Sequence, residues 1–235
     1  MRRAPAVDLM IYVRALGLLV RNPSIIVVPL MMGLVGVFAG LVFSGDNNPI
    51  GVVTTQLAFS VVLLLNLFGF GTATILADQA WRRGRTSFDD GWTEARRKAP
   101  EILMASLGFT FVLFIAQYVA AIFGALGLLL VLAAVVFLIY TIPAAAIGGV
   151  PGGASIQVSI DRTRAHPLPA VVAAIVAIAA YMILPSLFFL MLANFGVVAN
   201  GIVGQLLVAL VKAVAIGYIA LVVGKTYSDV SFGRY

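Results

Sequence analysis

The sequence predicts an all-α polytopic membrane protein with six transmembrane helices and amphipathic interfacial helices on the cytoplasmic side. The composition is the first reason: 62% of the 235 residues are hydrophobic and 10% are charged, whereas soluble domains contain about 45–50% apolar and about 25% charged residues. The second reason is a series of uncharged apolar runs as long as a membrane-spanning helix, about 20 residues. The alternating segments of about ten residues that are typical of membrane β-barrels are missing from the sequence.

The apolar runs follow one another along the whole chain. At a rise of about 1.5 Å per residue, each is long enough to cross about 30 Å of hydrocarbon, the longer ones with a tilt. Pro29, Pro143 and Pro185 lie inside these runs and should kink the helices. The predicted spans are residues 25–43, 51–77, 102–123, 125–147, 168–193 and 202–223.

One long charged stretch, residues 78–101, interrupts the runs. It holds six of the fifteen basic residues and five of the nine acidic ones, so it must lie in water or at a membrane surface. The net charge of +6 would suggest a nucleic-acid partner for a soluble protein. Basic residues that flank hydrophobic spans are better explained by membrane orientation and by anionic lipid. The sequence therefore predicts anionic membrane lipids as partners, and no nucleic acid.

Lysine and arginine fall on one side of the predicted membrane. Fourteen of the fifteen precede the first span, separate spans 2 and 3, separate spans 4 and 5, or follow the last span, and the other connections contain none. By the positive-inside rule this side is the cytoplasm. We therefore expect a multi-pass protein of the inner (plasma) membrane with both termini cytoplasmic. Arg14 and Arg21 break the first apolar run, so the N-terminal stretch is expected to be structural and not a signal peptide.

Three prolines mark a possible internal repeat within one transmembrane domain, residues 1–235. Pro23, Pro100 and Pro167 each follow a short segment with basic residues, and each precedes two predicted spans. Since proline can end one helix and begin the next, each unit would consist of a surface helix and a helical hairpin. The alternative is coincidence, because proline is common at helix starts. The units would be residues 5–77, 86–147 and 154–223, followed by a cytoplasmic tail, residues 224–235.

The predicted surface helices carry most of the candidate lipid contacts. In the central helix, Ser87 and Asp90 have the spacing of a helix N-cap. Trp81 and Trp92 are expected to anchor at the membrane interface, where tryptophan is enriched. One interpretation is plain anchoring of amphipathic helices in the headgroup plane, and the other is recognition of lipid headgroups by their cations. The candidate headgroup ligands are Arg96, Arg97, Lys98, Arg162 and Arg164.

Three stretches of this sequence resemble a known group of proteins. They are GRTSFDDGWTEARRKAPEILMASL, PGGASIQVSIDRTRAHPLPAVVAAI and the ending GKTYSDVSFGRY. The chain resembles uncharacterised bacterial multi-pass proteins similar to the membrane domain attached to some glycerophosphoryl diester phosphodiesterases, and to the YciC-like proteins. The resemblance covers most of the chain and includes a Tyr-x-Asp motif, here Tyr227 and Asp229.

The chain also departs from that group. It has Gly148 and Gly149 where a glutamate often follows span 4, and Val230 and Ser231 where an arginine often follows the Tyr-x-Asp motif. No phosphodiesterase domain is recognised in the printed sequence, so that activity is not expected here. The resemblance therefore implies the architecture and no activity.

The sequence offers little for catalysis. Cysteine is absent, and the single histidine, His166, has no histidine or cysteine companion, so neither a thiolate nucleophile nor a typical zinc site is predicted. Asp89 and Asp90 are adjacent and would point about 100° apart on a helix, which does not make a catalytic pair. No carboxylate lies deep in a span, which argues against a proton-relay transporter. We expect a protein that is not an enzyme and needs no cofactor or metal.

Lys212 is the one charged residue near the middle of a predicted span. A charge at that depth is costly, so the side chain should face the protein interior or a wet cavity. Gln205 lies seven residues earlier on the same helix face, and Asn66 offers a polar group from another span. Lys212 is interpreted either as structural or as a ligand for an anion or a lipid phosphate. The small residues expected to permit close helix packing are Gly33, Gly36 and Gly40.

Two functions fit these observations. The first is a non-enzymatic integral membrane protein that acts as a lipid-interacting scaffold or as an accessory subunit of a membrane complex, with a protein partner. The second is a small transporter or channel for an anionic solute or lipid, with a path past Lys212. The first is favoured, because intramembrane charges that transport coupling would use are nearly missing while the surface helices are elaborate.

Overall fold

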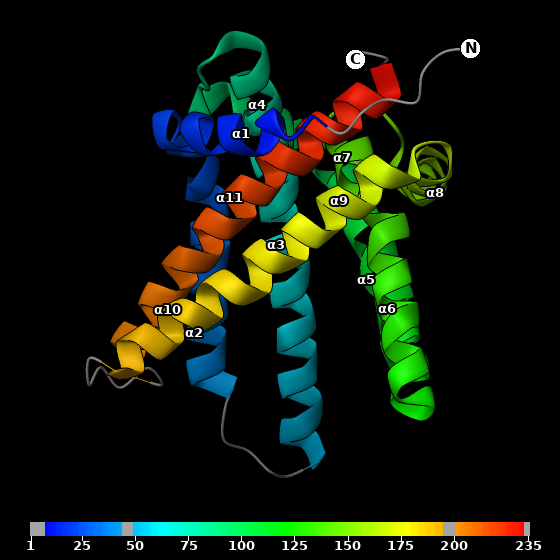
Figure 1. Cartoon of the computed structure of the whole chain (residues 1–235). Coiled ribbons are helices and arrows are strands. Elements are labelled where there is room, and N and C mark those ends of the chain that lie inside the picture. Colours follow the sequence, from blue (N-terminus) through cyan, green and yellow to red (C-terminus); the bar gives the residue numbers. More distant parts are fainter. Residues whose placement is uncertain (1–7, 44–48, 195–200, 233–235) are drawn as a thin grey trace.

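The computed structural model describes residues 8–43, 49–194 and 201–232, and in these ranges the chain is helical with no strand (Figure 1). The prediction of an all-α polytopic protein is confirmed. The described part contains six helical segments that are long and apolar enough to cross a membrane. They are Ser24–Phe43, Leu57–Arg83, Ala99–Phe123, Ala125–Ala146, Pro167–Asn194 and Ile202–Phe232.

Three short helices lie at one end of the bundle, together with the C-terminal end of the last span (Figure 1). They are α1 (Met10–Arg21), α4 (Phe88–Arg97) and α8 (Ser155–Ala165). Each one stops shortly before a proline and is followed by a spanning helix, as predicted. The predicted cap of α4 is also present, because the Ser87 hydroxyl accepts a hydrogen bond from the Asp90 amide at 3.4 Å.

The centre of the molecule is built from α2 (Ser24–Phe43), α3 (Pro49–Arg83) and α11 (Ile202–Phe232), which pack on one another, with α1 across α11. Their shared core is made largely of alanine and branched aliphatic side chains, which allow close approach of the helices. Both α3 and α11 continue past the predicted ends of their spans, at residues 77 and 223, into charged segments. Hydropathy marks where lipid ends, whereas the helix continues as long as its backbone bonds are favourable.

The fourth span is interrupted just before Pro143, one of the three prolines expected to kink their spans. It consists of α6 (Ala125–Leu138) and the short α7 (Thr141–Ala146). Pro143 lacks the amide hydrogen that would continue the ladder, so the helix is interrupted just before it. The hydroxyl of Ser159 on α8 repairs the break, because it donates to the Phe137 carbonyl at 2.7 Å and accepts from the Tyr140 amide at 3.1 Å.

The fifth span also contains an irregularity. It runs through α9 (Pro167–Ile178), a π-helical turn (Ala179–Ile183) and α10 (Leu184–Asn194). The turn directly precedes Pro185, which removes one backbone donor and shifts the hydrogen-bond register. The pair α9 and α10 lies obliquely beside α11 (Figure 1).

The third and fourth spans form a hairpin of α5 (Ala99–Phe123) and α6 at one side of the bundle (Figure 1). A Cβ added to Gly127 would lie 2.1 Å from the Cα of Ala120, so the two helices touch backbone to backbone near the hairpin tip. Gly124, with a φ of 57°, makes the turn between them.

Candidate functional site

A half-open pocket lies within the spanning part of the bundle. It has a cavity volume of about 390 Å³ and is walled by α2, α3, the segment with the π-helical turn and α10, and α11. Its polar lining includes Lys212, Gln205 and Asn66, so the structure brings together the three residues that the sequence analysis connected. The volume falls within the range of about 300–1,000 Å³ that is typical of small-molecule sites.

Lys212 supplies the only formal charge among the described residues that line this pocket. Its side chain is exposed, and it forms no ion pair with any residue in the described ranges. A lysine at the centre of a spanning helix costs about 2.5–3.5 kcal/mol on insertion scales. Asn66 lies opposite on α3, half-buried, and its amide group donates to the Val62 carbonyl at 2.9 Å. The pocket therefore carries one positive charge and receives polar groups from both α11 and α3.

The wall formed by α2 explains why the pocket is open. A Cβ on Gly36 would lie 3.0 Å from Val62, and one on Gly33 would lie 3.7 Å from Ala209, so both positions pack closely as predicted. The prediction is wrong for Gly40, where an added Cβ would have no atom of the described residues within 4 Å. There α2 and its neighbours diverge, and the sequence pattern of small residues cannot distinguish a packed seam from the wall of a cavity.

The rim of the pocket is aromatic. Phe59, Tyr181 and Phe189 line it and are 52%, 42% and 39% exposed. These side chains come from α3, the π-helical turn and α10. The pocket therefore presents exposed aromatic rings as well as the exposed Lys212 side chain to the surroundings of the bundle.

The end of the pocket nearest α1 is closed. Pro29 and Ile216 form its last lining residues in that direction. Beyond them a Cβ on Gly217 would lie 2.8 Å from Ile26 and 3.1 Å from Leu19, so α11, α2 and α1 are packed without space between them. The cavity thus enters the spanning region without crossing it.

The cations predicted to meet lipid headgroups do not form one cluster. Arg96 and Arg97 are exposed on α4, which packs on α3 and α5, while Arg164 is exposed on α8, which packs on α6 and α7. Arg162 is half-buried. Lys98 is held by the protein itself, since its ammonium group pairs with Glu94 at 2.9 Å and donates to the Ala146 carbonyl at 2.7 Å.

The two tryptophans contact the protein on different helices. Trp92 on α4 stacks on Phe88, with ring centroids 6.4 Å apart, and meets Phe68 of α3 edge-on at 6.3 Å. Trp81, at the end of α3, donates its indole N–H to the Leu221 carbonyl of α11 at 2.9 Å. Trp81 thus joins two central helices, a role that its expected position as an interface anchor does not include.

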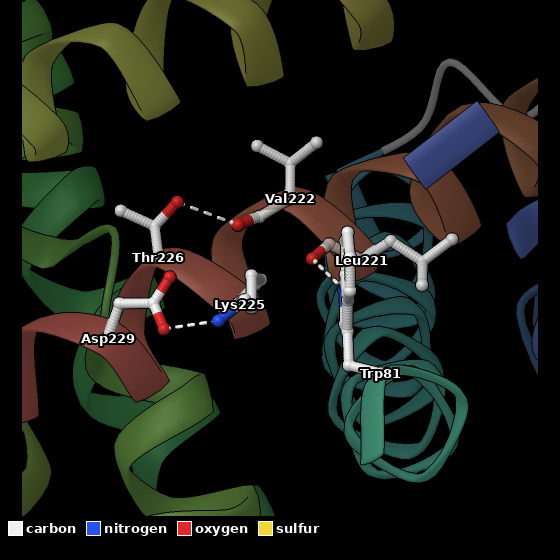
Figure 2. A network of polar contacts seen from close by, with 6 residues as sticks. All are labelled: Trp81, Leu221, Val222, Lys225, Thr226 and Asp229. Atoms are coloured by element: carbon white, nitrogen blue, oxygen red, sulfur yellow. Dashed lines mark hydrogen bonds and ion pairs between the residues drawn. The ribbon is translucent and has the colours of Figure 1, made fainter. Parts of the chain in front are cut away.

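The Tyr-x-Asp motif is buried near the end of α11. Its aspartate, Asp229, belongs to the polar network drawn in Figure 2. Asp229 is 3% exposed and pairs with Lys225 one turn earlier on the helix. Tyr227 is 2% exposed and packs on Tyr140, with ring centroids 5.9 Å apart. Its hydroxyl lies where a Cβ on Gly148 would be, at 2.2 Å. Gly148, one of the positions at which the chain departs from the group that it resembles, thus leaves room for Tyr227.

Sequence analysis missed several polar contacts at this end of the bundle. Asn22 is 4% exposed; its amide group donates to the Leu18 carbonyl at 2.9 Å and the Gly84 carbonyl at 3.4 Å and accepts from the Thr86 amide at 2.9 Å. The Glu101 carboxylate accepts from the Gly152 amide at 2.7 Å. The ion pairs within helices could be predicted, because an acidic and a basic residue stand four positions apart in each. Nothing in the sequence indicates the distant partners of Asn22 and Glu101.

The described residues contain no group of three or more histidine, cysteine, aspartate or glutamate side chains that could hold a metal ion. A second cavity, of about 350 Å³, lies between the ends of α3 and α11, lined by Asp78, Trp81, Arg82, Lys225 and Ser228. Asp78 pairs with Arg82 at 2.8 Å, and the nearby Asp229 pairs with Lys225. Each of these two carboxylates therefore has a cation beside it.

The fold and these sites define an all-α, multi-pass membrane protein with a polar intramembrane pocket. Comparison of the chain with protein-family models, with curated proteins and with solved structures finds no match.

Proposed function

We propose that this chain is a non-enzymatic integral membrane protein of the bacterial inner (plasma) membrane that acts as a lipid-interacting scaffold or as an accessory subunit of a membrane complex. In this proposal the end of the bundle that carries α1, α4 and α8 faces the cytoplasm, together with both chain termini. The positive-inside rule supports this orientation, because the arginines gather at that end.

One observation carries the lipid-binding part of the proposal. Arg82, Lys98 and Lys225 pair with acidic residues one turn away along the helix. The exposed arginines that form no ion pair with a described residue are Arg96, Arg97 and Arg164, which the sequence analysis selected, together with Arg14, Arg21, Arg83 and Arg85. A basic residue near a membrane surface attracts anionic lipid with about 1 kcal/mol. The exposed arginines are therefore the groups that anionic headgroups would meet.

The test is retention of anionic lipid by the purified protein. The protein is reconstituted in nanodiscs of phosphatidylcholine with phosphatidylglycerol, and the lipid that remains bound after transfer to detergent is counted by native mass spectrometry. We expect the triple substitution Arg96→Gln, Arg97→Gln and Arg164→Gln to lower the retained phosphatidylglycerol. The matched control is Arg82→Gln, which removes an arginine that already has a carboxylate partner. Equal retention by the triple variant and the wild-type protein would contradict the proposal.

A second candidate function is a small transporter for an anionic solute or lipid that uses Lys212. The pocket around Lys212 favours it, and the closed packing around Gly217 means that a conformational change would be needed for passage. Flux of a fluorescent anionic lipid and of chloride into proteoliposomes distinguishes the candidates. Robust flux that is lost in Lys212→Ala would favour transport, and the absence of flux in the wild type would favour the accessory function.

A further inference from the structure

We infer that the Lys212 pocket is a binding site for the anionic headgroup of a membrane lipid that enters sideways from the half of the bilayer opposite α1, α4 and α8. This inference extends the lipid-interacting part of the proposed function to a second site. The pocket shares no residue with the site at the surface arginines. Lipid binding at one site can therefore be disproved while lipid binding at the other is retained.

The charge in the pocket favours an anionic ligand. Lys212 is the only charged residue among the described lining residues, and no described carboxylate pairs with it. An ammonium group at this depth is stabilised by an opposite charge much more than it would be in water, because the surrounding dielectric is low. Gln205, on the same face of α11, and Asn66, across the pocket on α3, add neutral polar groups that can hydrogen-bond a phosphate or its glycerol.

The shape of the pocket selects a lipid over a free solute. The Lys212 side chain is exposed at the side of α11, and the rim consists of the partly exposed rings of Phe59, Tyr181 and Phe189. Apolar rings at the level of the hydrocarbon core are a suitable surface for acyl chains, whereas a small hydrophilic anion gains nothing from them. A lipid can place its headgroup on Lys212 while its chains remain outside, against these rings.

The direction of entry follows from the closed end. The packing of Gly217 on Ile26 and Leu19 blocks the side toward α1, while Gln205 lies three residues from the first residue of α11, at the opposite end of the helix. The polar groups therefore extend from that end of the bundle inward to Lys212. Beside Gly40 on α2 the wall is open, which leaves a passage for the lipid from the same half of the membrane.

The test measures lipid bound in the pocket by native mass spectrometry of protein from nanodiscs with phosphatidylglycerol, under detergent conditions in which annular lipid is removed. We expect Lys212→Gln to lower the affinity for phosphatidylglycerol about tenfold or more, the value of one charge-assisted hydrogen bond. Lys212→Arg keeps the charge and should retain the lipid. Gly40→Leu places a side chain beside α2, where an added Cβ has no described atom within 4 Å, and should also lower the affinity.

Two controls keep the result specific. Arg97→Gln removes a surface arginine and should leave the lipid in the pocket unchanged, while the variants of the pocket should leave the lipid at the surface arginines unchanged. Undiminished binding in both Lys212→Gln and Gly40→Leu would overturn the inference. Binding of inorganic phosphate by a protein that retains no lipid in the pocket would also overturn it, because the pocket would then bind a free anion and not a lipid.

Discussion

The contact of Gly148 with Tyr227 shows how a single hydrogen can decide the packing of a helix end. Tyr227 lies in a core cluster with Tyr140, Ala144 and Val223, which joins α7 to α11. The Tyr227 hydroxyl occupies the space beside Gly148 that any other side chain would need. The resemblance stated from the sequence places this tyrosine in a Tyr-x-Asp motif, and the structure gives it a packing role.

Gly148→Ala should destabilise the protein by about 1–3 kcal/mol, the usual cost of overpacking. The new Cβ would lie 2.2 Å from the Tyr227 hydroxyl and 2.6 Å from the Ala144 carbonyl. Thermal unfolding in detergent measures the effect. Gly153→Ala is the control, since nothing lies within 4 Å of a Cβ there. Adding Tyr227→Phe to the Gly148→Ala variant should recover part of the loss, and no recovery would show that the hydroxyl is not the obstacle.

The ion pairs near the end of α11 should differ in strength according to their burial. In the pair of Lys225 and Asp229 the side chains are 26% and 4% exposed, whereas in the pair of Arg82 and Asp78 they are 48% and 17% exposed. Exposed pairs contribute about 0–1 kcal/mol, but a carboxylate that loses its partner while buried costs several kcal/mol. We therefore expect Lys225→Met to lower the thermal stability clearly more than Arg82→Met. Equal effects of the two substitutions would contradict this account.

At the scale of helices, α8 belongs to the structure of its neighbour as much as to the surface. The Ser159 hydroxyl bonds on both sides of the break between α6 and α7, and Thr163 donates to the Val136 carbonyl at 3.4 Å. A spanning helix interrupted by Pro143 needs such partners, because water is scarce where the carbonyls are released. Interpreting α8 only as a membrane anchor would overlook the hydrogen bonds that it supplies to the interrupted span.

Ser159→Ala should destabilise the protein by about 1–3 kcal/mol, because it removes a buried donor and a buried acceptor together. Faster hydrogen exchange of the Tyr140 amide would accompany the loss, and mass spectrometry can detect it. Gln157→Ala, on the exposed face of the same helix, is the control and should change stability by less than about 0.5 kcal/mol. Unchanged exchange at Tyr140 in the serine variant would count against the proposed repair of the break.

The elements themselves were predictable because the membrane imposes a simple rule on the sequence. An apolar run of sufficient length must be a helix, since no other single segment satisfies its own backbone in lipid, and the predicted spans agree with those observed to within a few residues at most ends. The break after Leu138 and the π-helical turn before Pro185 depend on which neighbours can satisfy a freed carbonyl. That information lies in the tertiary structure and not in hydropathy.

The candidate pocket was predictable only in part. Lys212, Gln205 and Asn66 could be connected because polar residues in lipid seek one another. The wall at Gly40, the aromatic rim and the closure at Gly217 arise from the angles at which α2, α10 and α11 meet, which the sequence pattern does not encode. The headgroup role of Lys98 likewise remains without support, because Glu94 and the Ala146 carbonyl already occupy its ammonium group.

For the whole molecule, the junctions at the first two prolines have comparable contacts. Asn22, next to Pro23, bonds to Thr86, the first residue of the predicted second unit, and to Gly84 just before it. Glu101, next to Pro100, bonds to Gly152, which lies between the predicted second and third units. Lys98 bonds to Ala146 within the second unit. The chain next to each of these prolines is thus bonded to a segment at the border of the next predicted unit. Internal repetition itself remains a prediction.

The orientation of the bundle is the prediction with the widest consequences. The structure places α1, α4, α8 and the C-terminal end of α11 at one end of the bundle (Figure 1). Determining the side of the membrane on which one of them lies therefore determines it for all of them. Alkaline phosphatase inserted after Arg85 should be inactive and the same enzyme inserted after Gly124, at the tip of the hairpin of α5 and α6, should be active, because it folds only outside the cytoplasm. A fluorescent protein fused after Tyr235 should fluoresce.

The reason for this expectation is the distribution of arginine and lysine, which resist transfer across the inner membrane. A reporter at Asn47, the connection between the first two spans, should agree with the one at Gly124, although that residue lies outside the described ranges. Immunoblots that show equal amounts of each fusion protein control for expression. An active phosphatase at Arg85 together with a fluorescent protein at the C-terminus that does not fluoresce would show that the protein has the opposite orientation in the membrane. The surface arginines would then face away from the anionic cytoplasmic leaflet, and the Lys212 pocket would open toward it.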